Sequence, residues 1–366
     1  MSERFDFSIL GGGISGLLTA YELSQAGFSV CVIDISAVGR ESSWAGGGIL
    51  LPLYPWRQAE SISDLVIASL ALYPDLITDL VTQSHINPEF IVSGLLLSTL
   101  PDRPAALDWC RRYQIRYQLP TPDAPFHPAL QCQLDQPLWL PDIAQARNPR
   151  LLKALKATLQ QRDVVFFEHC QVHTIHHQNQ HITHLQTQDK TIATGHLVVT
   201  AGAWTSTLFD QLLPDITPPP AIKPIKGQML LFDSPPGLLP FMVLANDRYL
   251  IPRQDGKILV GSTVEDTGFD KQTSDTARQQ LYQFATTLLP ALEDYPVGHH
   301  WAGLRPGTDA GVPCISLHPD IDNLSINAGH FRNGLGMGPA SAKLLADLIL
   351  ERSPLLNPEP YQLKSL

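Results

Sequence analysis

The sequence predicts a mixed α/β and α+β fold, in which a Rossmann-like dinucleotide-binding domain is joined to a discontinuous substrate domain with a mostly antiparallel sheet. Two glycine-rich turns near opposite ends of the chain carry this prediction: Gly11-Gly12-Gly13-Ile14-Ser15-Gly16 and Gly329-His330-Phe331-Arg332-Asn333-Gly334. Each turn follows a short apolar run and leads into a helical pattern, an arrangement that presents free N–H groups to a cofactor. We therefore expect both ends of the chain to surround one long cofactor.

The N-terminal turn has the features of a dinucleotide-binding βαβ unit. Residues 5–10 and 28–33 are apolar and predict two buried strands, with helical spacing between them. Three glycines should permit the tight turn, the approach of a pyrophosphate and close packing of helix on strand: Gly11, Gly13 and Gly16.

Asp34 ends the second predicted strand, where an acid would bind a ribose hydroxyl and disfavour a 2′-phosphate. The unit therefore predicts a dinucleotide other than NADP. It does not by itself distinguish FAD from NAD.

Composition limits the classes of function. The 366 residues suffice for two domains, and the net charge of −10 argues against a nucleic-acid partner, because phosphate backbones attract an excess of Lys and Arg. Five cysteines without a C-x-x-C pair indicate unpaired thiols in a reducing compartment. There is no signal-peptide pattern and no apolar run of roughly 18 residues, so we expect a cytoplasmic protein without a membrane span.

The dinucleotide-binding domain is expected to begin with residues 1–85. A helix is predicted over 60–82, and Pro74 should kink or split it. Between Asp34 and this helix lies either a flexible loop or a segment that lets the backbone approach a flat ring, and the sequence leaves both open. Its small residues are Ser42, Ser43, Ala45, Gly46, Gly47 and Gly48.

Residues 86–149 are rich in proline and turn residues and predict the first part of the substrate domain, after which residues 150–213 return to the first domain. A helix is predicted over 149–161. Five histidines between residues 172 and 185 alternate with apolar residues, which predicts a hairpin with the histidines on its exposed face. No Cys or carboxylate cluster lies near them, so we expect no metal site.

A strand over 196–200 leads into Ala201 and Gly202, which should lie close to the cofactor. Residues 214–310 predict the second part of the substrate domain. Its strand and helix patterns lie at 227–232, 248–252, 257–261 and 278–289. Residues 311–366 return to the first domain, with a strand over 324–328 and a last helix that begins near Pro339.

The order of these motifs resembles the FAD-dependent D-amino-acid oxidase family, and within it most closely the bacterial glycine oxidases of thiamine biosynthesis. Besides the two turns, the similarity rests on Thr200-Ala201-Gly202-Ala203-Trp204, Pro224-Ile225-Lys226-Gly227-Gln228 and Trp301-Ala302-Gly303-Leu304-Arg305-Pro306. It spans nearly the whole chain. It implies noncovalent FAD, because Gly303 stands near the position where the related sarcosine oxidases attach their flavin to a cysteine.

The resemblance also implies a cofactor site. The first turn, with Ile14 and Ser15, would hold the pyrophosphate, Asp34 the adenosine ribose, and Val172 the adenine side. The flavin would lie against the small residues at 42–48 and against the second turn: Gly329, His330, Arg332, Asn333 and Gly334.

By the same resemblance, Arg305 would bind the substrate carboxylate through two parallel hydrogen bonds, with Tyr249 as a second donor and Arg332 nearby. The alternatives are an interdomain salt bridge for Arg305, a core position for Tyr249 and a structural role for Arg332. The implied reaction moves a hydride from the amino-acid Cα to flavin N5 and releases an imine, then a 2-oxo acid and ammonia. Dioxygen then reoxidises the flavin to give hydrogen peroxide.

Other functions remain open at this point: a D-amino-acid or sarcosine oxidase or dehydrogenase of the same superfamily, an NAD-dependent dehydrogenase, or a flavin-binding subunit. The relatives also suggest a possible homo-oligomer.

Overall fold

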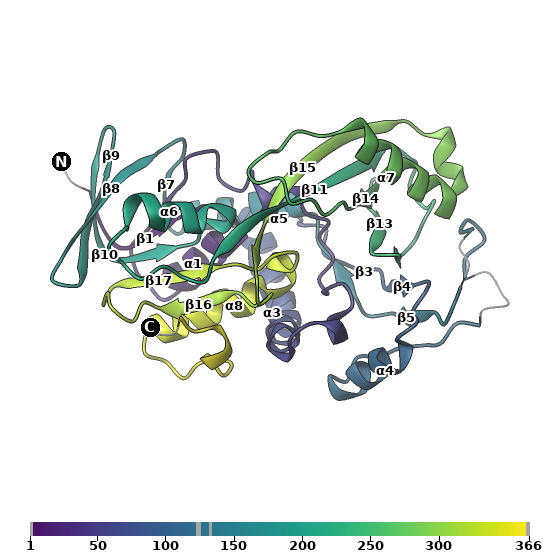
Figure 1. The fold of residues 1–366 in the computed structure, drawn as a ribbon, viewed down its shortest axis with the longest axis horizontal. Coiled ribbons are helices and arrows are strands. Elements are labelled where there is room, and N and C mark those ends of the chain that lie inside the picture. The colour runs from purple at the N-terminus through teal and green to yellow at the C-terminus, as the bar shows by residue number, and fades with distance from the viewer. Residues whose placement is uncertain (1–2, 122–125, 132–133, 364–366) are drawn as a thin grey trace.

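The computed structural model describes residues 3–121, 126–131 and 134–363, and Cys132 lies outside this part of the chain. Its two large sheets lie side by side along the long axis of the molecule (Figure 1). One has eight strands and the other seven, and β3 (Ile91–Val92) and β6 (Ala144–Gln145) form a separate pair. The mixed fold with a separate, mostly antiparallel sheet is therefore confirmed.

The eight-stranded sheet has a parallel centre in the order β17-β10-β1-β2-β7. These strands are β1 (Glu3–Leu10), β2 (Val30–Ile33), β7 (Val165–Phe167), β10 (Thr191–Val199) and β17 (Leu324–Ala328). β16 (Cys314–Leu317) adds an antiparallel edge to β17. Because β1 and β17, from the first and last segments of the chain, flank β10 as parallel strands, both glycine turns emerge from the same edge of one sheet.

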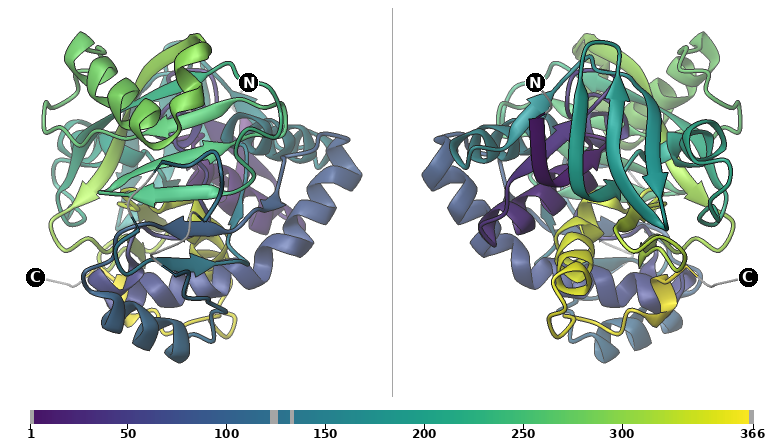
Figure 2. Two further views of the ribbon diagram at one scale, coloured as in Figure 1. Left: turned by 90° about the vertical axis from the view of Figure 1, so that its right-hand side faces the viewer. Right: turned by 90° about the vertical axis from the view of Figure 1, so that its left-hand side faces the viewer.

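The predicted histidine hairpin is confirmed as β8 (Val172–Gln178) and β9 (His181–Thr187), and β9 pairs with β10. Figure 2 shows these strands side by side near the N-terminus. Val172, Ile175 and Ile182 are buried, whereas the histidines are exposed or half-buried. Within the part of the chain that the structure describes, no group of three or more His, Cys, Asp or Glu could hold a metal ion.

Four helices pack together on one side of this sheet. They are α1 (Ile14–Gln25), α3 (Glu60–Ser84), α5 (Asn148–Gln161) and α8 (Gly334–Ile349). Residues of alternate orientation in the strands divide the core: Phe7 and Ile9 pack toward α1 and α8, and Ile33 and Val199 pack toward the hairpin and α6 (Thr205–Leu212). This alternation follows from the two-residue period of a strand.

Both helices with an internal proline run through it. Pro74 is exposed and does not split α3, whereas the predicted start of the last helix near Pro339 was wrong: α8 begins at Gly334 and Pro339 lies inside it. Pro339 cannot donate to the Leu335 carbonyl, but the Tyr73 hydroxyl of α3 donates to that oxygen at 2.7 Å. The next N–H, that of Ala340, is bonded to Ser69 Oγ at 3.0 Å. Side chains of α3 thus satisfy the groups that the proline frees.

By length and composition, α3 could cross a membrane, with a mean hydropathy of 1.5 over its most apolar window. About a third of that window, 33%, is buried, and α3 packs against α5 and α8. Core helices of soluble proteins also meet these criteria of length and hydropathy, so α3 alone is weak evidence for a membrane span. The expected absence of a membrane span stays a prediction.

The seven-stranded sheet has the order β15-β11-β14-β13-β12-β4-β5 and is antiparallel except where β12 meets β4. Its strands are β4 (Leu95–Leu97), β5 (Leu138–Leu140), β11 (Ile222–Phe232), β12 (Met242–Ala245), β13 (Arg248–Pro252), β14 (Ile258–Gly261) and β15 (Val297–Thr308). Helix α7 (Asp275–Leu288) covers one face, where Leu230, Leu250 and Val260 are buried. The opposite face carries Met229, Tyr249 and Ile251 and packs toward the first sheet.

The long pair β11 and β15 joins the two halves of the molecule. Ile222, at one end of β11, belongs to the core under the hairpin, and Phe232, at the other end, belongs to the core under α7. The remaining short helices are α2 (Ser42–Ala45) and α4 (Arg103–Arg112), with 3-10 turns at Pro55–Arg57, Gly202–Trp204, Pro290–Asp294 and Glu359–Tyr361.

Candidate active site

One continuous cavity runs between the two sheets and is lined by both glycine turns. Every residue predicted for the cofactor or the substrate lines it except Gly16. Asp34 and Val172 line it together with Arg305 and Tyr249 of the second sheet. The cavity is therefore long enough to bring the predicted adenosine, pyrophosphate, flavin and substrate residues to one ligand.

The first turn is built so that only glycine fits. Gly11 has φ +114°, and a Cβ there would lie 2.5 Å from the Thr200 carbonyl oxygen. A Cβ on Gly16 would lie 2.0 Å from the Gly11 oxygen, so Gly16 serves the packing of α1 on the turn and does not need to reach the cavity. The Asp34 carboxylate accepts the Gly12 N–H at 2.7 Å, which holds the turn to the end of β2.

The loop at 42–48 is tied to this turn and to the second sheet. Ser43 Oγ accepts the Ile14 N–H, the first N–H of α1, at 2.9 Å. The side-chain amide of Asn148 donates to the Ser43 carbonyl at 2.7 Å. On the other side, the buried Arg253 guanidinium donates to the Gly47 carbonyl at 2.7 Å. These contacts favour an ordered backbone surface over a flexible loop.

The second turn leads directly into α8. Gly329 has φ +89°, and Asn333 is the N-cap residue of the helix. The His330 imidazole is buried and hydrogen-bonded to Ser341 Oγ at 2.7 Å, and burial lowers its pKa to about 4. His330 is thus neutral at physiological pH, and the N-terminal dipole of α8 points toward the cavity where negative charge would be stabilised.

Arg305 lies on β15 at the junction of the two sheets. Its Nη1 donates to the carbonyls of Lys226 (3.3 Å) and Thr263 (3.2 Å), and its Nη2 donates to Ser262 Oγ (2.7 Å). Burial lowers the pKa of Arg305 below its usual value, although the guanidinium stays charged. Among the described residues, no carboxylate forms a salt bridge with Arg305. The described residues therefore do not form the interdomain salt bridge that was the alternative role for Arg305.

Gly227 explains how this guanidinium fits. It lies on the adjacent strand β11, and a Cβ there would come within 2.1 Å of Arg305 Nη2 and 2.3 Å of its Cζ. The guanidinium therefore lies across the bare backbone of Gly227. Gly227 belongs to the motif Pro224-Ile225-Lys226-Gly227-Gln228 that supports the family resemblance, but no role was predicted for it.

Tyr249 and Arg332 approach the same part of the cavity. Tyr249 is buried on the cavity face of β13, and its hydroxyl lies 3.5 Å from Met229 Sδ. Arg332 is exposed and close enough to Arg305 for like charge to lower the Arg305 pKa further. Sequence analysis missed four other residues that support this region, and no spacing pattern marks them: Asn148, Gly227, Arg253 and Ser262.

The donor set fits a long anionic dinucleotide, because two helix N-termini and glycine backbones face one cavity. A model of the FAD-dependent oxidoreductase family (DAO) matches residues 6–348. Glycine oxidase of Pseudomonas putida is 41% identical over 96% of each chain, and the bifunctional protein ThiO/ThiG of Trichormus variabilis is 30% identical over 96% of this chain and 54% of its own. The crystal structure of glycine oxidase from Geobacillus kaustophilus matches with a TM-score of 0.92 and 26% identity over 99% of each chain. The chain therefore belongs to the FAD-dependent oxidoreductase family, and FAD is its cofactor.

Proposed function

We propose that this protein oxidises glycine, or a similarly small amino acid, at its Cα–N bond. The observation that carries the proposal is Arg305, a buried cation in the cofactor cavity whose described partners are two carbonyls and a hydroxyl. A buried charge without a counter-charge is costly, so the site favours an anionic ligand. A substrate carboxylate would supply that charge and bind with the charge-assisted geometry that arginine provides.

Tyr249 would donate a second hydrogen bond to the same carboxylate, because it lines the cavity beside Arg305. With the carboxylate fixed at these two residues, the amino-acid Cα would be held at a single position over the cofactor. FAD, when bound, would supply the acceptor for the hydride of the Cα–H bond, and its two electrons would pass on to dioxygen and yield hydrogen peroxide, while the amine loses a proton as the imine forms. The apolar wall around Met229 and Leu51 would limit water and large side chains.

The cofactor residues have matching proposed roles. The first turn would hold the pyrophosphate, Asp34 the ribose, the loop at 42–48 and the second turn the flavin, and Val172 the adenine side. The two discontinuous domains would divide as predicted, at 1–85, 150–213 and 311–366 for FAD, and 86–149 and 214–310 for substrate. The glycine oxidase and ThiO/ThiG relatives support a place in thiamine biosynthesis, where the imine of glycine would feed thiazole formation. We propose a cytoplasmic location on the sequence features alone.

Arg305→Ala tests the proposal. It should lower kcat/KM for glycine at least tenfold, because charge-assisted hydrogen bonds contribute about 1.5–3 kcal/mol each. FAD content should stay unchanged. Arg248→Ala is the matched control, since Arg248 lies on β13 and contacts Gln280 rather than the cavity. Equal kinetics of Arg305→Ala and the parent would refute the role of Arg305.

A further inference from the structure

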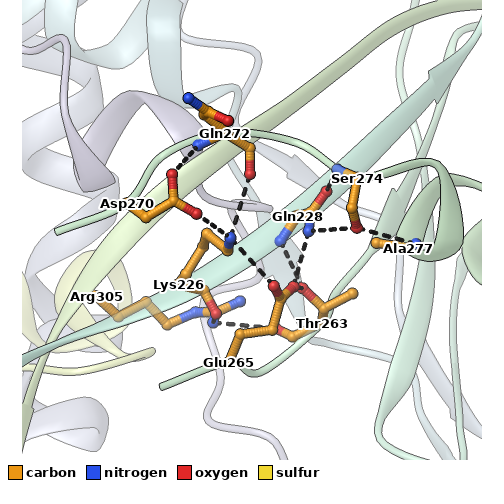
Figure 3. Close-up of polar contacts among 9 residues, drawn as sticks. All are labelled: Lys226, Gln228, Thr263, Glu265, Asp270, Gln272, Ser274, Ala277 and Arg305. Atoms are coloured by element: carbon orange, nitrogen blue, oxygen red, sulfur yellow. Dashed lines mark hydrogen bonds and ion pairs between the residues drawn. The ribbon is translucent and has the colours of Figure 1, made fainter. Parts of the chain in front are cut away.

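A partly buried ionic cluster lies on the face of β11 opposite the cavity, directly behind Arg305 (Figure 3). Lys226 Nζ is 2.8 Å from Asp270 Oδ2 and 3.3 Å from Glu265 Oε2, and it also donates to the Gln272 carbonyl at 3.2 Å. The Lys226 side chain is only 5% exposed. The two carboxylates are more exposed, 27% for Glu265 and 44% for Asp270, and exposed ion pairs contribute little to stability, so stability alone does not account for the cluster.

The cluster reaches Arg305 through the segment Ser262–Glu265, which follows β14. This segment supplies two of the three oxygens that accept hydrogen bonds from Arg305, namely Ser262 Oγ and the Thr263 carbonyl. The third is the Lys226 carbonyl, which also accepts the Glu265 N–H at 2.9 Å. The Lys226 carbonyl therefore contacts the guanidinium directly, and the Glu265 N–H holds that carbonyl in place.

Side chains hold this segment against β11. Gln228 Nε2 donates to Glu265 Oε1 at 2.9 Å, and the Thr263 hydroxyl donates to the same oxygen. The Gln228 N–H in turn donates to Thr263 Oγ1 at 2.9 Å. The carboxylate of Glu265 is thus the point at which Lys226, Gln228 and Thr263 meet (Figure 3).

Lys226 and Glu265 are both charged at neutral pH. Asp270 raises the pKa of Lys226 above its usual value, against the effect of burial. Burial raises the pKa of Glu265, but hydrogen bonds from Thr263 and Gln228 and the charge of Lys226 outweigh it, so the net pKa is lowered.

We infer that Lys226 and Glu265 are positioning residues that set the carboxylate-binding geometry of Arg305. The inference rests on the proposed function, in which Arg305 binds the substrate carboxylate. Loss of either charge would free the Ser262–Glu265 segment and displace the oxygens that orient the guanidinium. A displaced guanidinium would weaken binding of any carboxylate ligand, while the bound cofactor, held by the other sheet, would be unaffected.

The test uses the FAD-loaded full chain with Glu265→Gln and Lys226→Met, each nearly isosteric with the native side chain. Binding of glycolate, which has the carboxylate of glycine without its amine, is titrated through the change in the flavin absorption spectrum. We expect the glycolate Kd and the KM for glycine to rise about tenfold, with kcat changed by less than about threefold. Lys223→Met is the matched control, because Lys223 lies on the same strand but pairs with the exposed Asp309. It should leave the glycolate Kd unchanged.

Arg305→Ala is titrated in parallel, which separates the proposed carboxylate binding by Arg305 from its positioning by Lys226 and Glu265. If Arg305→Ala binds glycolate like the parent, the proposed role of Arg305 fails. If Arg305→Ala weakens binding but Glu265→Gln and Lys226→Met stay within twofold of the parent, the positioning inference is overturned. Should both charge variants fail to fold, Thr263→Val removes the hydroxyl contacts to Glu265 and Gln228 alone, and an unchanged glycolate Kd in that variant also overturns it.

Discussion

Gly227→Ala is the sharpest test of how the two sheets build the substrate site. The new Cβ would lie 2.1 Å from Arg305 Nη2, and ordinary contact begins at 3.4 Å, so the guanidinium must shift by about 1.3 Å (3.4 − 2.1). The Nη2 to Ser262 bond is 2.7 Å long, and such a shift takes it beyond hydrogen-bonding distance unless Ser262 follows. The same displacement would misalign Arg305 with the carboxylate.

The expected loss follows from the bonds involved. One charge-assisted hydrogen bond contributes about 1.5–3 kcal/mol, so kcat/KM for glycine should fall roughly tenfold to a hundredfold in Gly227→Ala. FAD should remain bound, because the cofactor residues belong mostly to the other sheet.

Peroxide release under steady-state conditions gives kcat/KM, and the flavin spectrum of the purified protein gives the FAD content. Gly336→Ala is the control, since a Cβ there meets only ordinary contacts at 3.6 Å. If Gly227→Ala retains kcat/KM within twofold of the parent, the function of Arg305 does not depend on the close approach of its guanidinium to Gly227, and the proposed role of Gly227 is wrong.

Three further predictions concern stability and cofactor binding. Tyr73→Phe leaves the Leu335 carbonyl beside Pro339 unpaired, so the free energy of unfolding measured in urea should fall by about 1–3 kcal/mol, and a loss below 0.5 kcal/mol would contradict this. Burial lowers the pKa of His330 from 6.5 to about 4, so the unfolded chain binds a proton below pH 6.5 that the native state does not, and stability is lost as the pH falls toward 4. His330→Gln should therefore remove about 2–3 kcal/mol of the stability difference between pH 7 and pH 4.5, and an unaltered difference would argue against a buried neutral imidazole. Asp34→Ala frees the Gly12 N–H, and the FAD Kd of the apoprotein, followed by flavin fluorescence, should rise at least about tenfold; an unchanged Kd would remove Asp34 from the site.

Local patterns predicted most of the framework and the order of the cavity-lining residues. Gly11, Asp34 and the glycines of the second turn lie within short segments whose strand–turn–helix order is visible along the chain. The hairpin likewise follows from alternation of apolar residues and histidines, and its pairing is observed.

Features that depend on contacts between distant segments were not predictable. Pro339 indicated a helix start, yet α8 runs through it because Tyr73 and Ser69 of α3 satisfy the freed groups. Arg253 directly follows the strand β13, and only the fold brings it to the Gly47 carbonyl. Gly227 needs no side chain because Arg305 from the neighbouring strand lies over it, which no spacing along one strand reveals.

Hydrogen peroxide release by the purified FAD-loaded protein tests the central claim most directly. Glycine is compared with sarcosine, D-alanine and D-proline, and oxygen consumption and the 2-oxo acid product are measured together. The account predicts turnover of glycine with peroxide and glyoxylate formed in equal amounts. Turnover of D-alanine or D-proline without turnover of glycine, or reduction of the flavin by glycine without peroxide, would contradict it.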